Sequence, residues 1–514
     1  MKQVLNLQLY IFNINKMPKP IPLNLNELEQ IANKYNTPYY LYDELSIKMN
    51  AINYMNTFKK YFPDFKQYYA VKALPNPSIL NILKKCGMGF DCSSPEEIQI
   101  VQLVDFYSDK KSDIMYTSNY TSKSDLEWVL QNSQNTIINL DSIDCFQNLL
   151  ETNEKLPDCI CFRYNPIMID GEFDVTDIKH LSSKKNISNL SKELFTNTQK
   201  LKTQLEDNKK KNNKDTEILK SNNFSGEDTK FGMTFKYIFE AYKLAKFKNI
   251  KKFGIHVMPH SNCIDIDYWS KLIDHMFQVI YEISIKLDID ISFMDIGGGF
   301  GIPYKPEQKE IDLEKLVLLI RERFDYNLSK YEITEPLLMT ECGRYITGPY
   351  GWLVSRCQSI KHTGTQTFYG LDASMANLMR PGMYEAYHDI TIPRYIHEAK
   401  WPILNKANVV GTLCENNDWF CKDRLLPIGI KKGDLFVIHD CGAHAYSMGF
   451  NYNSKLHCPE ILLTKNGIKE IRKKETLDYH LQNTSMYFNS YIATMNMLFV
   501  IILLMIIILY FLFN

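Results

Sequence analysis

The chain has 514 residues, 45% of them hydrophobic and 23% charged, which is long enough for two domains with cores of their own. Lysine plus arginine and aspartate plus glutamate both number 59, so no overall field favours nucleic acid or an anionic membrane. The 12 cysteines include no Cys-x-x-Cys pair, and we expect no metal site. Without a recognisable secretory signal, we expect a cytoplasmic protein with reduced thiols.

Three segments differ in composition from the rest of the chain. Residues 1–23 mix apolar residues with asparagine, and we expect a disordered N-terminal extension. Residues 182–228 are rich in Lys, Asn, Ser and Thr, which bury too little apolar surface to order a segment, so we expect a disordered surface insertion. Residues 481–514 form a hydrophobic tail whose uncharged run of about 17 residues just reaches the length of a membrane span.

Two interpretations of the tail remain open. A C-terminal anchor would attach the protein to a membrane and leave the rest in the cytoplasm. Alternatively, ends rich in Ile, Leu, Phe and Asn are typical of translated AT-rich non-coding DNA. The nearest basic cluster, residues 472–474, lies about twenty residues before the apolar run, whereas anchors keep their flanking charges closer, which favours the second interpretation.

From residue 24 onwards, short β-rich runs alternate with amphipathic helical stretches. Such runs predict strands at 67–73, 89–92, 136–140, 159–164, 252–257 and 292–296. This alternation predicts a parallel sheet or barrel of βα units, and we favour a TIM-type (β/α)8 barrel over residues 24–345. One helix start is well marked, because Ser94 can cap the helix, Pro95 fits the first helical position and Glu97 completes a capping box.

Near residue 352 the pattern changes to β-runs separated by turns. Such runs lie at 366–371, 407–410, 434–438 and 460–463. We therefore expect a C-terminal β-domain over residues 346–480, to which the first strand region of the chain also contributes.

Lys72 ends the apolar run 69–73, at the carboxyl end of a predicted barrel strand, where the catalytic residues of such barrels lie. Burying an ammonium is costly, and a desolvated lysine loses its proton more readily and can form a Schiff base with a carbonyl. Pyridoxal phosphate is the commonest cofactor bound in this way. The alternative is a lysine that extends from a strand end to water.

Gly297, Gly298 and Gly299 directly follow another predicted strand, together with Asp295 before them. Glycines at such a position let backbone N–H groups approach a phosphate. The spacing does not match a dinucleotide-binding fingerprint. The alternative is an ordinary glycine-rich loop.

Glu341 and Arg344 follow the apolar run 337–339. A carboxylate at a strand end can keep the pyridine nitrogen of the cofactor protonated, and an arginine can bind a phosphate or carboxylate bidentately. The alternative is a Glu–Arg pair that orders a loop. In the predicted β-domain, Cys414 stands beside Glu415; a neighbouring carboxylate suits a thiol that donates a proton, whereas most such cysteines only pack in a core.

Together these motifs resemble those of the fold-type III pyridoxal phosphate decarboxylases, and most closely the diaminopimelate branch, over about residues 24–472. The family's Tyr-Ala-Val-Lys-Ala matches 69–73, its glycine triplet 297–299, its Glu-Pro-Gly-Arg 341–344, its Leu-Met-Arg-Pro 378–381, its Cys-Glu-Ser-Gly-Asp 414–418, and its Gly-Ala-Tyr-Gly with Asn-Tyr-Asn 442–445 and 451–453. The resemblance implies a barrel of the alanine-racemase type followed by a β-domain.

The resemblance also implies roles for individual residues. Lys72, Glu341 and Cys414 would be catalytic, Lys72 as the Schiff-base lysine. Pyridoxal phosphate would be bound by Lys72, Asp91, Arg163, His256, Ser261, Gly297, Gly298, Gly299, Glu341, Gly343, Arg344 and His444. Substrate would be bound by Arg344, Arg380, Tyr384, Glu415, Asp418 and His444.

The implied reaction is decarboxylation of meso-2,6-diaminopimelate to L-lysine, in a head-to-tail homodimer where Cys414 comes from the partner subunit. The ornithine and arginine relatives carry Cys-Asp at 414–415. Glutamate there, with Arg344 and Arg380, suits a substrate whose far end carries both an ammonium and a carboxylate. Another basic amino-acid decarboxylase, an amino-acid racemase of the same fold and a catalytically silent partner-binding relative remain alternatives.

Three positions depart from the family pattern. Met258 replaces the histidine that stacks on the cofactor ring, so that either His256 shifts to replace it or a thioether contact serves. Cys342 replaces the proline of Glu-Pro-Gly-Arg. His444 replaces a tyrosine whose phenol reaches cofactor and substrate.

Overall fold

The computed structural model describes residues 19–108, 110–169, 172–174, 178, 229–396 and 403–485, with 497, 501–502 and 504–506 of the tail. The predictions for residues 182–228, for residues 1–18 and for most of the tail therefore lie outside the described residues. Among the helices of the described part, none combines the length and the apolar composition that crossing a bilayer requires.

Within the described residues, eight parallel strands close into a barrel in the order β10-β11-β2-β3-β4-β5-β6-β9. Their bounds are β2 (Lys66–Ala70), β3 (Gly89–Cys92), β4 (Ile114–Thr117), β5 (Ile137–Leu140), β6 (Cys159–Tyr164), β9 (Lys252–Val257), β10 (Ile291–Asp295) and β11 (Leu337–Thr340). Neighbours run in parallel register, for example Tyr69 beside Phe90. The carboxyl ends of all eight strands therefore meet at one mouth.

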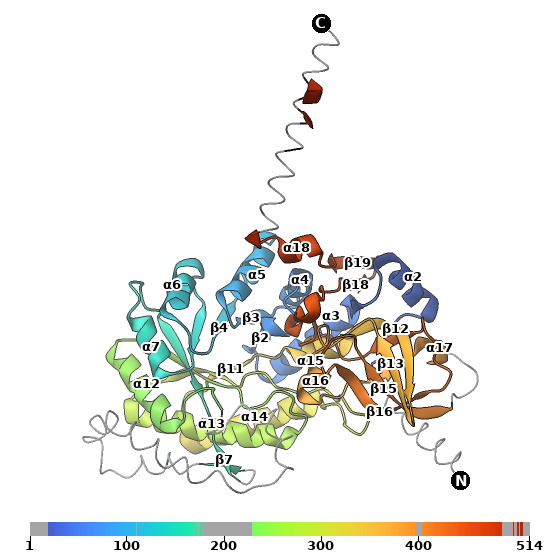
Figure 1. Ribbon diagram of the computed structural model, residues 1–514. Helices are drawn as coiled ribbons and strands as arrows, with labels where there is room; N and C mark the ends of the chain where they lie inside the picture. The colour runs from blue at the N-terminus through green and yellow to red at the C-terminus, as the bar shows by residue number, and fades with distance from the viewer. Residues whose placement is uncertain are drawn as a thin grey trace, which may run out of the picture.

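Helices surround the barrel, as Figure 1 shows. They are α3 (Glu44–Tyr61), α4 (Pro77–Lys85), α5 (Pro95–Phe106), α6 (Lys123–Asn132), α7 (Ile143–Leu150), α12 (Phe235–Phe247), α13 (Ile266–Leu287) and α14 (Leu313–Tyr331). At the start of α5, Ser94 accepts a hydrogen bond from the Glu97 amide and Pro95 takes the first position. The predicted capping box is wrong in one detail, because the Glu97 carboxylate reaches one residue further back and accepts from the Ser93 amide at 2.6 Å.

A second sheet lies beside the barrel (Figure 1). Its main path is β16-β15-β13-β12-β1-β18-β19, with β17 paired to β12 and β14. The bounds are β1 (Tyr39–Asp43), β12 (Gly351–Thr363), β13 (Gln366–Leu371), β14 (Ile390–Thr391), β15 (Leu404–Val410), β16 (Trp419–Pro427), β17 (Leu435–Ile438), β18 (Glu460–Thr464) and β19 (Gly467–Arg472). Because β1 pairs with β12 and β18, the chain enters this sheet before it forms the barrel.

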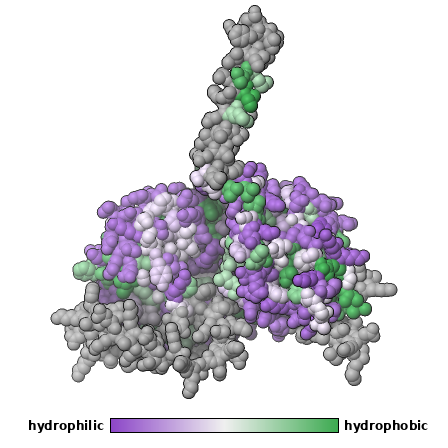
Figure 2. All heavy atoms as spheres, viewed as in Figure 1, coloured by the Kyte–Doolittle hydropathy of each residue, from purple (hydrophilic) through white to green (hydrophobic). Residues whose placement is uncertain are grey.

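Shorter elements complete the described part. They are α2 (Leu25–Tyr35), α15 (Arg344–Thr347), α16 (Arg380–Tyr384), α17 (Pro393–Ile396), α18 (Leu477–Leu481) and the hairpin of β7 (Met168–Ile169) and β8 (Glu172–Phe173). Single 3-10 turns lie at Val71–Ala73, Gly348–Tyr350, Tyr446–Met448 and Tyr452–Ser454. In Figure 2, polar residues cover most of the visible described surface, and the surface is hollowed between the barrel and the second sheet.

One end of the barrel is filled by apolar side chains. The cluster consists of Tyr68, Met115, Cys161, Phe293 and Met339. Gly254 on β9 leaves the space that the Phe293 ring occupies, because a Cβ there would overlap the ring. The barrel is therefore a packed core, and polar side chains gather at its opposite mouth.

The predicted fold, a TIM-type barrel joined to a β-domain, is confirmed. Strands β3, β6 and β9 have the predicted bounds. The pattern missed β4, whose four residues are all buried and show no alternation. It also missed β12, whose first half is buried on both faces and whose second half is largely exposed, so that neither half shows a period of two.

Candidate active site

Lys72 lies at the mouth of the barrel, in the 3-10 turn that directly follows β2. Its Nζ lies 3.1 Å from Oδ2 of Asp91, a buried residue of β3, and 3.4 Å from Oγ of Ser93. The lysine side chain is 46% exposed. The amine is therefore held by its partners and still open to a ligand.

The charge of Lys72 differs from the expectation. Loss of hydration lowers the pKa of the amine, but the negative charges of Asp91, Glu341 and Glu97 outweigh this effect and raise its pKa. The expectation that desolvation removes the proton is therefore wrong. The surrounding carboxylates decide the charge, and the lysine is an ammonium.

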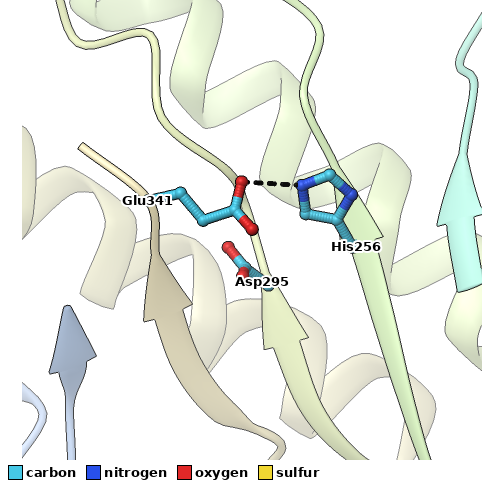
Figure 3. A group of neighbouring side chains, drawn as sticks. All are labelled: His256, Asp295 and Glu341. Atoms are coloured by element: carbon cyan, nitrogen blue, oxygen red, sulfur yellow. Dashed lines mark hydrogen bonds and ion pairs between the residues drawn. The ribbon is translucent and has the colours of Figure 1, made fainter. Parts of the chain in front are cut away.

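Three buried side chains from adjacent strands point toward one another at this mouth, as Figure 3 shows. They are His256 of β9, Asp295 of β10 and Glu341 directly after β11, and their polar atoms lie within 4.8 Å of one another. His256 Nε2 lies 3.1 Å from Glu341 Oε2, and the Thr117 hydroxyl donates to Glu341 Oε1 at 3.1 Å. Side chains of these types can also bind a metal ion. Here the His256–Glu341 contact already engages two of the three.

The pKa values of the two carboxyl groups in this cluster are shifted in opposite directions. Burial raises the pKa of Glu341, but His256 and Lys72 outweigh burial and lower it to about 2. Burial and the negative charge of Glu341 raise the pKa of Asp295 well above its usual value. Burial and charge therefore make Asp295 a weaker acid than Glu341.

The glycine triplet lies between strand ends. Gly297 and Gly299 have φ of +72° and +94°, which other residues rarely adopt. A Cβ on Gly298 would lie 2.6 Å from the carbonyl oxygen of Glu341, and one on Gly299 would strike the carbonyl oxygen of His260. The glycines are therefore needed first for the close packing of neighbouring strand ends, a reason that the sequence-based argument from phosphate binding did not include.

Met258, at the position where the family has histidine, lies against this loop. Its Sδ is 3.1 Å from the amide nitrogen of Gly298. His256, two residues earlier on the same strand, uses its ring to contact Glu341. The two residues therefore have different neighbours: the thioether contacts the glycine loop, and the imidazole contacts the carboxylate.

Arg344 begins α15 and is buried. Its guanidinium donates to the Ser261 hydroxyl at 3.2 Å, to the Ser261 carbonyl at 3.3 Å and to the Tyr304 hydroxyl at 2.6 Å. A Cβ on Gly343 would lie 2.6 Å from that of Ala73, so glycine lets this turn pack against the turn of Lys72. The predicted residues Ser261, Gly343 and Arg344 thus lie together.

Arg163, near the end of β6, is also buried. Its Nη1 donates to Oδ1 of Asn119 at 3.1 Å and lies 3.8 Å from Oδ1 of Asp141. Its positive charge also lowers the pKa of Glu341, by less than His256 and Lys72 do. It therefore borders the cluster around Glu341.

Two residues of the second half extend the site. His444, with φ of +55°, donates its backbone N–H to the carbonyl of Ala73 at 2.8 Å. Burial, and then the charges of Arg344, Arg380 and Lys72, lower the pKa of its imidazole well below the usual value, so the ring is neutral. Arg380, the first residue of α16, is buried. His444 therefore lies within reach of the charges of Lys72, Arg344 and Arg380.

Other predicted site residues are exposed on the second half. Cys414 and Glu415 are exposed, and the Tyr384 side chain is 43% exposed. The Cys414 amide donates to Oδ1 of Asn453 at 2.8 Å, and the Tyr452 hydroxyl donates to the Cys414 carbonyl at 3.4 Å. The Cys414 motif therefore contacts the motif of residues 451–453. Within the described chain, no hydrogen bond of either motif reaches Lys72 or Glu341.

Asp418 has a different use from the one expected. It is buried, its Oδ1 accepts from the amide of Met375 at 2.6 Å, and its Oδ2 accepts from the amide of Leu413 at 2.7 Å. Both oxygens are therefore engaged by backbone. The predicted substrate contact does not fit this arrangement, because the carboxylate organises the loop that carries Cys414.

Three residues of the site were not predicted. Asp295 had a usable signal, since a carboxylate directly before a glycine turn ends a strand at the barrel mouth. Tyr304 binds Arg344, and His388 binds Arg380 at 2.8 Å. These two stand in no motif, and only the folded chain places them beside the arginines.

Comparison with known proteins identifies the family to which the chain belongs. The family described as "Pyridoxal-dependent decarboxylase, C-terminal sheet domain" matches residues 39–442. The chain belongs to this family of pyridoxal-dependent decarboxylases. It is similar to protein TabA of Pseudomonas amygdali pv. tabaci, at 33% identity over 88% of this chain and 92% of that protein.

Two further relatives carry a more specific name. Diaminopimelate decarboxylase of Methanothermobacter thermautotrophicus is 29% identical over 87% of this chain and 91% of its own. The crystal structure of diaminopimelate decarboxylase from Helicobacter pylori, complexed with L-lysine, is similar with a TM-score of 0.68 at 25% identity, covering 88% of this chain and 98% of that one. The predicted family and the predicted cofactor, pyridoxal phosphate, are confirmed: the protein is a pyridoxal phosphate-dependent decarboxylase with an amino-acid substrate.

The residues at the mouth of this decarboxylase fit such a cofactor. The groups that suit this cofactor lie on neighbouring strand ends. The amine of Lys72 suits its aldehyde, and the carboxylate of Glu341 suits a protonated pyridine nitrogen. The pair of Arg344 and Ser261 suits its phosphate. Within the described part, Oδ1 of Asp91 and Nδ1 of His256 are buried without a hydrogen-bond partner. A polar ligand in the mouth would offer them partners.

Proposed function

We propose that this decarboxylase converts meso-2,6-diaminopimelate to L-lysine and CO2. The observation that carries the proposal is a pair of buried arginines, Arg344 and Arg380, which have no carboxylate within ion-pair distance among the described residues. An uncompensated buried cation is costly unless a ligand neutralises it. The cofactor phosphate accounts for one such charge, and a second carboxylate on the substrate accounts for the other.

The barrel mouth holds the cofactor in this proposal. Lys72 is the amine for the aldehyde, Arg344 and Ser261 bind the phosphate, and Glu341 keeps a proton on the pyridine nitrogen. Pyridoxal phosphate, when bound, accepts the electron pair that remains when CO2 leaves the substrate α-carbon. The low pKa of Glu341, to which His256 and Lys72 contribute, supports its role, because only an ionised carboxylate can stabilise a protonated ring.

The far end of the substrate is an amino acid in its own right. Arg380 binds its carboxylate and Glu415 its ammonium, with Tyr384 and His444 beside them. Ornithine has no far carboxylate and would leave the Arg380 charge without a partner, which disfavours its binding. The neutral imidazole of His444 adds no positive charge to a neighbourhood that already holds Lys72, Arg344 and Arg380.

A second copy of the chain completes the site. Cys414, Glu415 and Tyr384 are all exposed in one chain. A Cβ on Gly382, in the helix that ends at Tyr384, would strike the carbonyl oxygen of Asn417, so the Cys414 loop and this helix share one surface. We propose a head-to-tail homodimer in which Cys414 of the partner gives its proton to the α-carbon and regains one from solvent.

A second candidate is decarboxylation of a different amino acid that also ends in a carboxylate. The 33% identity to a relative of a different name, TabA, favours it. The same two arginines would serve such a substrate. The two candidate substrates differ in the length of their carbon chains and in whether the far end carries an ammonium that Glu415 would bind.

The test is a substrate panel with pyridoxal phosphate at saturation. Initial rates of CO2 release are measured for meso-diaminopimelate, ornithine, arginine, lysine and glutamate, with chiral analysis of the remaining substrate. The proposal predicts the highest kcat/KM for meso-diaminopimelate. Faster release from ornithine or arginine, or racemised substrate without CO2, would reject it.

A further inference from the structure

The groups in direct contact with Arg380 carry no negative charge, and the buried carboxyl group of Asp440 acts on it from beyond ion-pair distance. Its Nη1 lies 2.8 Å from Nε2 of His388, and its guanidinium carbon lies 4.6 Å from the centre of the Tyr304 ring. The Tyr304 hydroxyl in turn accepts from Arg344 at 2.6 Å. A guanidinium commonly pairs with a carboxylate when buried, so this set of neighbours needs an explanation.

The neighbours of His388 determine its protonation state. Its Nδ1 lies 2.8 Å from the backbone carbonyl oxygen of His439, which can only accept, so Nδ1 carries the proton. Its Nε2 faces Arg380, which can only donate, so Nε2 must offer a lone pair. In an imidazolium, the N–H at Nε2 would point at an N–H of Arg380, and two donors cannot form a hydrogen bond with each other. The two contacts therefore both require a neutral imidazole with its proton on Nδ1.

The charges around His388 agree with this assignment. Burial, and then the positive charges of Arg380, Arg344 and Arg424, lower the pKa of His388 well below the usual value. Asp389 is the adjacent carboxylate, and it lies 3.7 Å from Arg424, whose Nη1 also donates to the His388 carbonyl. The acidic neighbour is thus engaged elsewhere, and the ring remains neutral across the pH range in which histidines usually titrate.

We propose that His388 is a positioning residue that fixes the Arg380 guanidinium through a neutral acceptor and leaves its positive charge for a carboxylate of the substrate. This rests on the proposed function, in which Arg380 receives the far carboxylate. A carboxylate at position 388 would hold the guanidinium equally well, but it would cancel the charge. The identity of residue 388 therefore determines whether the site favours substrates that end in a carboxylate.

A purely structural role makes a different prediction. His388 is fully buried, and its ring lies 5.1 Å from that of Tyr304, so it also fills space. If packing were its only contribution, substitutions would lower thermal stability and leave KM unchanged. The positioning role instead predicts that KM follows the charge of the side chain at position 388.

The experiment compares His388→Gln with His388→Glu in the full-length, cofactor-loaded enzyme. The two side chains have nearly the same shape and differ in charge. With meso-diaminopimelate, the Gln variant should keep KM within about 3-fold of wild type, because its amide oxygen still accepts from Arg380. The Glu variant should raise KM by about 10- to 100-fold, with kcat within about 3-fold, because the arginine is neutralised before substrate binds.

Two further variants separate folding from positioning. His388→Leu removes the acceptor without adding a charge, and KM should rise about 10-fold even if the Glu variant does not fold. His275→Gln is the matched control, because His275 is a buried, neutral histidine on α13 whose Nε2 bonds the Tyr164 hydroxyl at 2.8 Å. It should lower the melting temperature and leave KM unchanged.

Failure of the inference is distinguishable from failure of the proposed function. If wild type does not release CO2 from meso-diaminopimelate, the proposed function has failed. If wild type is active and the Gln and Glu variants share one KM, or the Leu variant keeps the wild-type KM, His388 does not position Arg380 and the inference is overturned.

Discussion

The barrel mouth and the Cys414 loop differ in how far one chain satisfies its own polar groups. At the mouth, Glu341 is buried and bound by His256 and Thr117. On the loop, the side chains of Cys414 and Glu415 are exposed, although Asp418 fixes the backbone around them. In the proposed dimer, the exposed groups of the loop serve the site of the partner, whereas the buried charged cluster serves a ligand within its own chain.

Removal of the lysine at the mouth should have the largest effect. Lys72→Ala removes the amine that holds the cofactor and the positive charge beside Asp91. We expect the decarboxylation rate to fall by more than about 10^4-fold, because the covalent attachment of the cofactor is lost. The measurement is CO2 release at saturating cofactor. A variant that keeps a tenth of the wild-type rate would show that another residue does this work.

Removal of the thiol on the loop should have the next largest effect. Cys414→Ala should lower kcat by about 10^2- to 10^4-fold, the range for loss of a positioned proton donor, with KM little changed. Single-turnover and steady-state rates of product formation measure it. A kcat near that of wild type would reject Cys414 as the donor.

Mixing the two inactive variants tests whether the two regions work across a dimer. Random exchange of Lys72→Ala and Cys414→Ala subunits gives about half mixed dimers, each with one intact site of two, and therefore about a quarter of wild-type activity. No recovery, in a mixture shown to exchange by native mass spectrometry, would place both residues of one site in the same chain.

The structural role of Asp418 in the Cys414 loop can be tested by a stability measurement, without an activity assay. Asp418→Ala leaves the part-buried amides of Met375 and Leu413 without their acceptor. The free energy of unfolding should fall by about 2–4 kcal/mol, from about 1–2 kcal/mol for each lost bond. Denaturant titration measures it. An unchanged midpoint, together with a raised KM, would favour the substrate contact that the sequence predicted.

The smallest expected effect concerns pH. Burial, and then Asp389, raise the pKa of Asp440 to about 7, above an unfolded value near 3.8. Because the folded state holds the proton more tightly, this group adds stability when the pH is below the unfolded pKa. That stability is lost as the pH rises through about 7. Asp440→Asn cannot ionise, and asparagine tolerates the φ of +57° at this position. It should therefore be more stable than wild type at pH 8 by about 1–4 kcal/mol and similar at pH 4. Melting curves at both values check this, and an equal difference at both would contradict it.

The sequence predicted the parts of the site that depend on position along a strand. Lys72, the glycine triplet and Glu341 each follow an apolar run, and parallel strands bring such positions to one mouth. The barrel and the β-domain were predicted for the same reason, since their periodicities are local.

The remaining features depend on contacts between distant segments. The raised pKa of Asp295 follows from its burial and from the charge of Glu341, and the raised pKa of Lys72 follows from carboxylates on other elements. The pairing of Arg380 with His388 spans a helix and the loop after it. The structural use of Asp418 depends on two amides that no motif contains. The sequence shows which polar side chains are present, but only the folded chain determines which of them contact one another.

The most direct test of the proposed function uses one sample and two readouts. Purified full-length enzyme is incubated with pyridoxal phosphate and meso-diaminopimelate, reduced with borohydride and digested. Mass spectrometry then locates the cofactor on the chain and measures L-lysine in the supernatant. We predict the cofactor's mass on the peptide that holds Lys72, together with L-lysine equal in amount to the substrate consumed. Cofactor on Lys72 without any L-lysine would contradict the proposed reaction, and cofactor on another lysine would contradict the proposed site.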